Sequence, residues 1–164
     1  MTPSVRGGAN ARLTNDIVAR LASLRPEKLV DAVCAILVGA GYVDVRLTGG
    51  RRATRSIGGE IRAAVKAGPT AVPILVVVKV QADPVSRRAV DELRGRMAAA
   101  GHCRGVIATA GTFRPGAADA AGDAIDLIDG KSLAEMMIAS GVGLRRLPTS
   151  FEPDETFFSV NRWS

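Results

Sequence analysis

One lysine stands in the most apolar stretch of the chain, which runs from Pro73 to Gln81. The unbroken Ile-Leu-Val-Val-Val run before it is typical of a central strand that is buried on both faces. A lysine in such a strand is costly to desolvate unless it opens onto a cleft or meets a carboxylate. Because side chains alternate along a strand, Lys79 shares a face with Val77 and Gln81. The residue is therefore either a salt-bridged or snorkelling lysine, or one placed to act on a phosphate group.

Basic residues are concentrated between positions 46 and 66. Six bases and one acid, Glu60, give this stretch +5 of the chain's formal net charge of +6. Phosphate is the natural counterpart of such charge, although a solvated edge that only aids solubility explains it equally well. The candidate phosphate contacts are four of the five arginines of this stretch and the two at the next helix start, namely Arg51, Arg52, Arg55, Arg62, Arg87 and Arg88.

Composition and motifs exclude several classes of protein. Aromatic residues make up only 4% of the chain, which argues against a single-strand binder that stacks bases. Cys34 and Cys103 lack zinc-ligand spacing, so we expect buried free thiols. No P-loop, dinucleotide-binding glycine motif or serine-hydrolase elbow is present, and the single histidine, His102, is expected to serve a turn. Because no apolar run approaches the roughly 20 residues of a membrane helix, we expect a cytoplasmic protein without a membrane partner.

The pattern of elements predicts an α/β fold. We expect a flexible N-terminal arm over residues 1–13, one domain over 14–146, and an aromatic, acidic arm over 147–164 that packs on this domain or on a neighbouring subunit. The later half alternates strand and helix with short connections, which favours a sheet with helices on both faces or a related three-layer sandwich. The expected helices span 14–21, 26–40, 87–100 with Ser86 as cap, 115–123 and 132–139, and the expected strands span 42–48, 60–66, 73–81, 104–109 and 125–128.

Two long segments resemble a known family. The run PEKLVDAVCAILVGAGYVDVRLTGG from Pro26 to Gly50 is similar to the opening helix and strand of the Mrr-like type IV restriction endonuclease domain. The blocks GVIATAGTF, IDLIDGKSLAEMMI and GVGL, and the tail EPDETFF, follow the same family's pattern. The resemblance covers roughly residues 26 to 158.

This resemblance implies a fold, a partner and a chemistry. The fold is a restriction-endonuclease-like three-layer sandwich, with a central mixed β-sheet flanked by helices on both faces, and the partner is double-stranded DNA, unmodified or modified. In the implied chemistry, carboxylates hold Mg²⁺ at the phosphate while a lysine orients water or stabilises charge. Lys79 matches the motif lysine, Glu60 is the candidate metal ligand, and Gln81 is a further candidate because it shares the face of Lys79.

The chain departs from the family's pattern at two positions that normally carry oxygen ligands. Val77 stands two residues before Lys79, where the family has Glu or Gln, and Val30 aligns with a glutamate of the opening helix, leaving Glu27 or Asp31 nearby. Three hypotheses follow: an Mg²⁺-dependent endonuclease, a catalytically inactive DNA-binding or scaffolding module, and a subunit that forms a homodimer or larger complex through residues 147–164.

Overall fold

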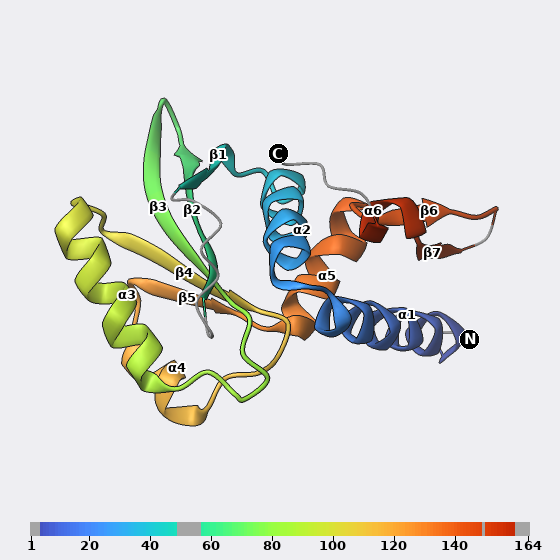
Figure 1. Cartoon of the computed structure of the whole chain (residues 1–164). Helices are drawn as coiled ribbons and strands as arrows, with labels where there is room; N and C mark the ends of the chain where they lie inside the picture. The colour runs from blue at the N-terminus through green and yellow to red at the C-terminus, as the bar shows by residue number, and fades with distance from the viewer. Residues whose placement is uncertain (1–3, 49–56, 149, 160–164) are drawn as a thin grey trace.

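A mixed five-stranded sheet in the order β1-β2-β3-β4-β5 forms the centre of the computed structural model, which describes residues 4–48, 57–148 and 150–159. Antiparallel pairing joins β1 to β2 and β2 to β3, whereas β3, β4 and β5 are parallel. Helices cover both faces (Figure 1), which confirms the predicted three-layer class. The strands are β1 (Val43–Thr48), β2 (Ile57–Ala67), β3 (Thr70–Lys79), β4 (Arg104–Thr109) and β5 (Ile125–Ile128).

The alternation of side chains along β3 divides the interior into two cores. Val77 lies in the core beneath α3 (Arg87–Ala100) and α4 (Pro115–Ala121), where Leu93 and Met97 pack. Val76 and Val78 lie in the core beneath α2 (Pro26–Gly39) and α5 (Gly130–Ser140). Both sets of side chains are buried, so β3 is the central strand that the sequence predicts, although it spans Thr70–Lys79 rather than 73–81 and leaves Gln81 outside.

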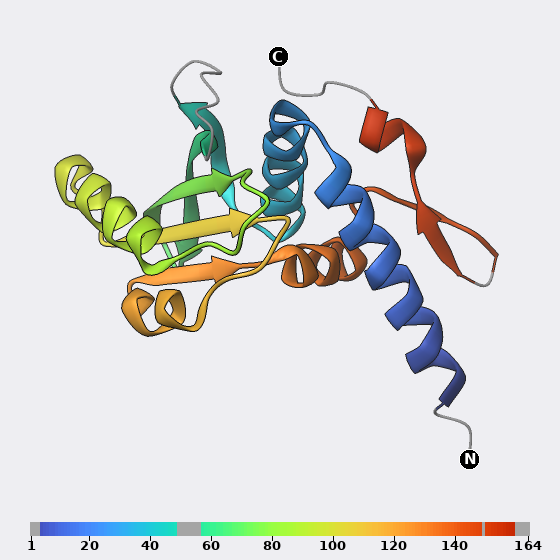
Figure 2. The same ribbon diagram turned by 60° about the horizontal axis from the view of Figure 1, so that its bottom comes forward.

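The first helix, α1 (Ser4–Ser23), begins well before the expected start near Thr14. The prediction of a flexible arm over residues 1–13 is therefore wrong for positions 4–13, which are helical. The second half of α1 packs against α5, and Ile17 and Leu21 are fully buried there. Figure 2 shows α1 crossing α5 and extending away from the sheet. Because helix propagation costs less than nucleation, this anchored half can extend the helix through Gly7 and Gly8.

The strand β2 also begins earlier than predicted, at Ile57 rather than Glu60. Gly58 and Gly59, which suggested a loop, lie inside the strand and let α2 approach its backbone. A Cβ atom at Gly59 would lie 3.1 Å from both methyl groups of Val30, and one at Gly58 would lie 2.5 Å from a methyl group of Val80. The two glycines therefore serve close packing of helix on strand.

The C-terminal segment folds onto its own domain. A hairpin of β6 (Leu144–Arg146) and β7 (Phe151–Pro153) precedes the short helix α6 (Glu155–Ser159). The prediction of an extended arm is therefore wrong, and the expected boundary after residue 146 falls inside the hairpin. Phe157 is buried and Phe158 is partly buried, as predicted for packing on this domain, whereas Phe151 is exposed. The remaining aromatic residue of the predicted arm, Trp163, lies outside the described residues.

Several expectations concern single residues. Cys34 is buried as predicted, and burial raises the pKa of its thiol to about 12, whereas Cys103 is exposed because it lies in the turn before β4. His102 lies in the same turn, and its backbone N–H donates to the carbonyl of Met97 at 2.9 Å. Ser86 precedes α3 in an extended conformation, but its side chain makes no capping hydrogen bond. No helix within the described ranges is long and apolar enough to cross a bilayer.

Candidate functional site

Lys79 ends the central strand and is almost completely buried, with 4% of its surface exposed. Its Nζ atom lies 3.6 Å from Oε2 of Glu92, which belongs to α3. Burial lowers the pKa of the ammonium, and the negative charge of Glu92 opposes this effect. The sequence left a cleft or a carboxylate partner open for Lys79, and the structure shows both, because Lys79 also lines a cavity.

Glu60 lies on the same face of the sheet as Lys79. It is directly opposite Val77 in the antiparallel β2–β3 pair, and paired residues point to the same side. Its Oε2 atom accepts from the guanidinium of Arg96 at 3.0 Å, and its Oε1 atom lies 3.3 Å from the hydroxyl of Thr48. The structure thus brings Glu60 and Lys79 under the same helix without making them partners.

Two oppositely directed ion pairs join this face to α3. Glu92 of the helix meets Lys79 of the sheet, and Arg96 of the helix meets Glu60 of the sheet. Glu92 and Arg96 are four residues apart, so they lie on one side of the helix. The sequence analysis missed both residues, although each directly precedes a buried apolar residue, Leu93 or Met97, and so flanks the buried stripe.

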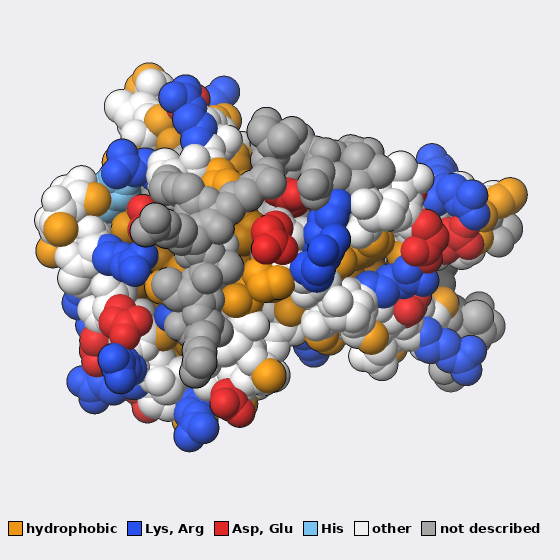
Figure 3. Space-filling model, in the orientation of Figure 1, with side chains coloured by type: hydrophobic (Ala, Val, Ile, Leu, Met, Phe, Trp, Pro, Cys, Tyr) orange, Lys and Arg blue, Asp and Glu red, His pale blue; other side chains and the backbone are white. Residues whose placement is uncertain are grey.

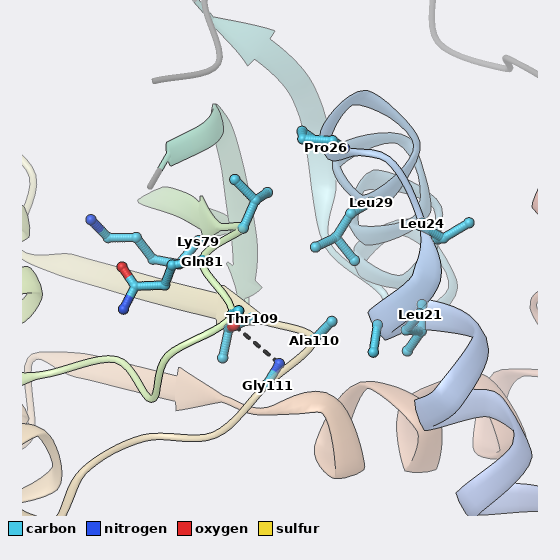
Figure 4. Close-up of a pocket in the computed structure, with 12 residues that line it drawn as sticks. Leu21, Leu24, Pro26, Leu29, Lys79, Gln81, Thr109, Ala110 and Gly111 are labelled. Atoms are coloured by element: carbon cyan, nitrogen blue, oxygen red, sulfur yellow. Dashed lines mark hydrogen bonds between the residues drawn. The ribbon is translucent and has the colours of Figure 1, made fainter. Parts of the chain in front are cut away.

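Gln81 lies two residues beyond the end of β3, where its side-chain amide donates to the carbonyl of Asp83 at 3.1 Å. Together with Lys79 and Thr109, it lines a cavity of about 300 Å³ at the carboxyl ends of β3 and β4. In Figure 4, Lys79 and Gln81 point away from the opposite wall of this cavity, which consists of apolar side chains of α1 and α2. The Thr109 hydroxyl accepts from the backbone N–H of Gly111 at 3.1 Å.

The residues on this face do not fit a resident Mg²⁺ ion. Such an ion takes oxygen ligands in near-octahedral geometry, usually with one or two carboxylates. Val77 offers no oxygen, and the carboxylates of Glu60 and Glu92 are each paired with a cation. Throughout the part of the chain that the structure describes, no three His, Cys, Asp or Glu side chains are placed to hold a metal. Val30 stands at the helix position where the resemblance places a glutamate, and its side chain packs against Gly58 and Gly59.

Three of the six candidate phosphate contacts lie within the described residues. Arg62 is exposed on β2, and Arg87 and Arg88 are exposed in the first turn of α3. Arg87 pairs with Asp91 at 3.5 Å, and Arg88 pairs with Glu92 at 3.0 Å, so Glu92 serves two cations. Figure 3 shows basic and acidic side chains interspersed over α3. The three arginines of the β1–β2 connection, Arg51, Arg52 and Arg55, lie outside the described residues.

Comparisons with known proteins identify a matching family and solved structures with the same fold. Residues 21–137 match the family model Mrr_cat, which is described as a restriction endonuclease. No curated protein matches the chain. Two solved structures share its fold. The DNA modification-dependent restriction endonuclease AspBHI has a TM-score of 0.56, with 16% identity over 87% of this chain. The MspJI restriction endonuclease in complex with a 27-mer oligonucleotide has a TM-score of 0.55, with 18% identity over 86%. The chain spans only 39% and 34% of these two proteins, respectively.

Proposed function

The chain belongs to the restriction endonuclease family that the Mrr_cat model describes, and from this premise we propose that it binds double-stranded DNA through the basic surface that β1, β2 and the start of α3 share. The observation that carries the proposal is the folding of the most basic stretch of the chain. Residues 46–66 hold +5 of charge. Their described parts are adjacent strands of one sheet edge and carry three bases, Arg46, Arg62 and Lys66, against one acid, Glu60, which is 3 − 1 = +2. A concentrated positive edge attracts the phosphate backbone whatever the sequence of the duplex.

Two further observations support DNA as the partner. The MspJI structure, which shares this fold, contains an oligonucleotide. Arg87, Arg88 and Arg96 of α3 supply further guanidinium donors for phosphate, although each is paired with a carboxylate in the free protein. Because these contacts address the backbone, we expect methylated and unmethylated duplexes to bind equally well.

The ion pairs beneath α3 favour binding without cleavage. Lys79 and Glu60 are engaged with Glu92 and Arg96, and Val77 supplies no ligand. A second candidate is Mg²⁺-dependent phosphodiester cleavage at this face, with Glu60 as metal ligand and Gln81 nearby. One observation favours it, namely that Glu60 and Lys79 lie on the same side of the sheet.

Duplex binding is tested by fluorescence anisotropy over a series of salt concentrations. We expect the logarithm of affinity to fall linearly with the logarithm of salt, and replacing Arg51, Arg52 and Arg55 by alanine to reduce the slope by about 3. No binding even at low salt would overturn the proposal. In a parallel plasmid assay with Mg²⁺ or Mn²⁺ we expect no nicking. Nicking that Lys79→Ala abolishes would establish the second candidate instead.

A further inference from the structure

Arg46 of β1 and Arg62 of β2 are directly opposite each other in the antiparallel pair. We propose that these two arginines form a clamp for a backbone phosphate of double-stranded DNA. The inference rests on the proposed function and assigns one particular contact within it. It adds Arg46 to the candidate site and gives Arg62 a partner.

The two side chains share the face of the sheet that carries Glu60 and Lys79. Arg62 is opposite Leu75 of β3, and Leu75 packs in the core beneath α3. Both arginines lie beyond the area that α3 covers, and 77% of the Arg46 side chain is exposed. Like charges that are directly opposite in an antiparallel pair destabilise the sheet. The pair is therefore unfavourable in the protein alone.

Acidic side chains of the protein do little to offset this repulsion. Asp44 lies 3.9 Å from Arg46, but both side chains are highly exposed, and such pairs contribute little. Glu60 is two residues from Arg62 on β2 and lies on the same face, but its Oε2 atom already accepts from the guanidinium of Arg96. Within the described ranges no carboxylate lies within 4 Å of the Arg62 guanidinium. Carboxylates of the described residues therefore do little to neutralise the charges of Arg46 and Arg62.

A phosphodiester has the chemistry that this arrangement needs. The Cβ atoms of opposite residues lie about 4.5–5.5 Å apart, so both side chains can reach one phosphate. Each guanidinium donates through a planar fork that matches phosphate oxygens. The connection between β1 and β2 carries three more arginines, and Lys66 is exposed on the same face of β2. This repetition of positive charge fits the regularly spaced phosphates of a duplex.

The test compares Arg46→Gln, Arg62→Gln and the double variant with the wild type in duplex-binding titrations at several salt concentrations. We expect each single variant to bind DNA roughly 5–10-fold more weakly at 0.1 M salt. In the double variant, the slope of the logarithm of affinity against the logarithm of salt concentration should decrease in magnitude by about 2. Arg62→Lys should retain the slope because it keeps the charge. The matched control is Arg146→Gln, an exposed strand arginine opposite Phe151 in the β6–β7 hairpin, which should bind like the wild type.

A second measurement separates a ligand site from a structural role. Without DNA, each single variant should melt at a higher temperature than the wild type in low salt, and the difference should vanish in high salt because salt screens the repulsion. A lower melting temperature in low salt would overturn the clamp.

An unchanged salt slope in the double variant, while the wild type binds DNA, would also overturn the clamp. That result would leave the proposed function intact. Failure of the wild type to bind DNA would reject the proposed function itself. Loss of binding to polyglutamate with unchanged DNA binding would show that the pair recognises acidic protein instead.

Discussion

The ammonium of Lys79 and the carboxylate of Glu92 lie 3.6 Å apart and join the end of the central strand to the helix that covers it. The lysine is buried, whereas 44% of the glutamate side chain is exposed. The pair therefore lets a charge remain inside the sheet while its partner stays in contact with water. Removal of this ion pair should therefore lower the stability of the domain more than it weakens DNA binding.

Replacing Glu92 by glutamine should destabilise the domain by roughly 1–3 kcal/mol, because a buried charge loses its partner. Lys79→Met removes the charge at similar volume and should cost less, and adding it to Glu92→Gln should recover most of the loss. Urea unfolding at neutral pH measures the three variants. A Glu92→Gln variant as stable as the wild type would show that the pair contributes nothing.

The lowered pKa of Lys79 predicts a pH dependence of stability. Between this lowered pKa and the ordinary value of 10.5, the unfolded chain binds more protons at this residue than the folded chain. Its contribution to stability should therefore rise as the pH rises through that window. The difference between the wild type and Lys79→Met isolates this effect, since Cys34 titrates equally in both. A difference in unfolding free energy that falls with pH would contradict the prediction.

Replacing Val77 by glutamate should create the metal ligand that this face lacks. The new carboxylate would lie opposite Glu60 and two residues before Lys79, and without metal its burial should lower the melting temperature. Added Mg²⁺ or Mn²⁺ should then restore part of the loss. Val77→Gln, which brings no charge, is the control and should respond much less. A large metal-induced rise in the wild type would show that a site already exists.

Gly143→Ala should loosen the attachment of the C-terminal segment. The backbone φ of Gly143 is +69°, and a Cβ atom would lie 2.5 Å from Met137 Cε and 2.9 Å from Phe157 Cδ1. We expect a loss of about 1–3 kcal/mol in unfolding free energy. Gly95→Ala on α3, where a Cβ atom meets nothing within 4 Å, is the matched control and should gain about 0.5–1 kcal/mol. Equal stabilities for the two variants would contradict this account.

The sequence predicts best where local pattern and burial agree. The bounds of α3, β4 and β5 are confirmed, because each has a clear period and a turn at both ends. It predicts worst where a contact between distant residues decides the structure. Gly58 and Gly59 look like loop residues until Val30 of α2 is seen to pack on them.

The candidate site follows the same rule. Alternation along β3 predicts correctly that Lys79 and Val77 share a face. The cost of burying an ammonium predicts either a cleft or a carboxylate at Lys79, and the structure has both. The identity of that carboxylate depends on how α3 crosses β3, which no local pattern encodes. The pairing of Arg46 with Arg62 likewise depends on the register of β1 against β2.

The first helices pack against segments that are synthesised much later. Arg20 of α1 contacts Glu155 of α6, and Lys28 of α2 donates to the carbonyl of Ser159 at 2.9 Å. Helix α1 ends at Ser23 and leaves the ribosome before its partner α5, which begins only at Gly130. At about 5–20 residues per second, the apolar side of α1 waits on the order of ten seconds for its cover. This interval is when the nascent chain most needs protection from aggregation.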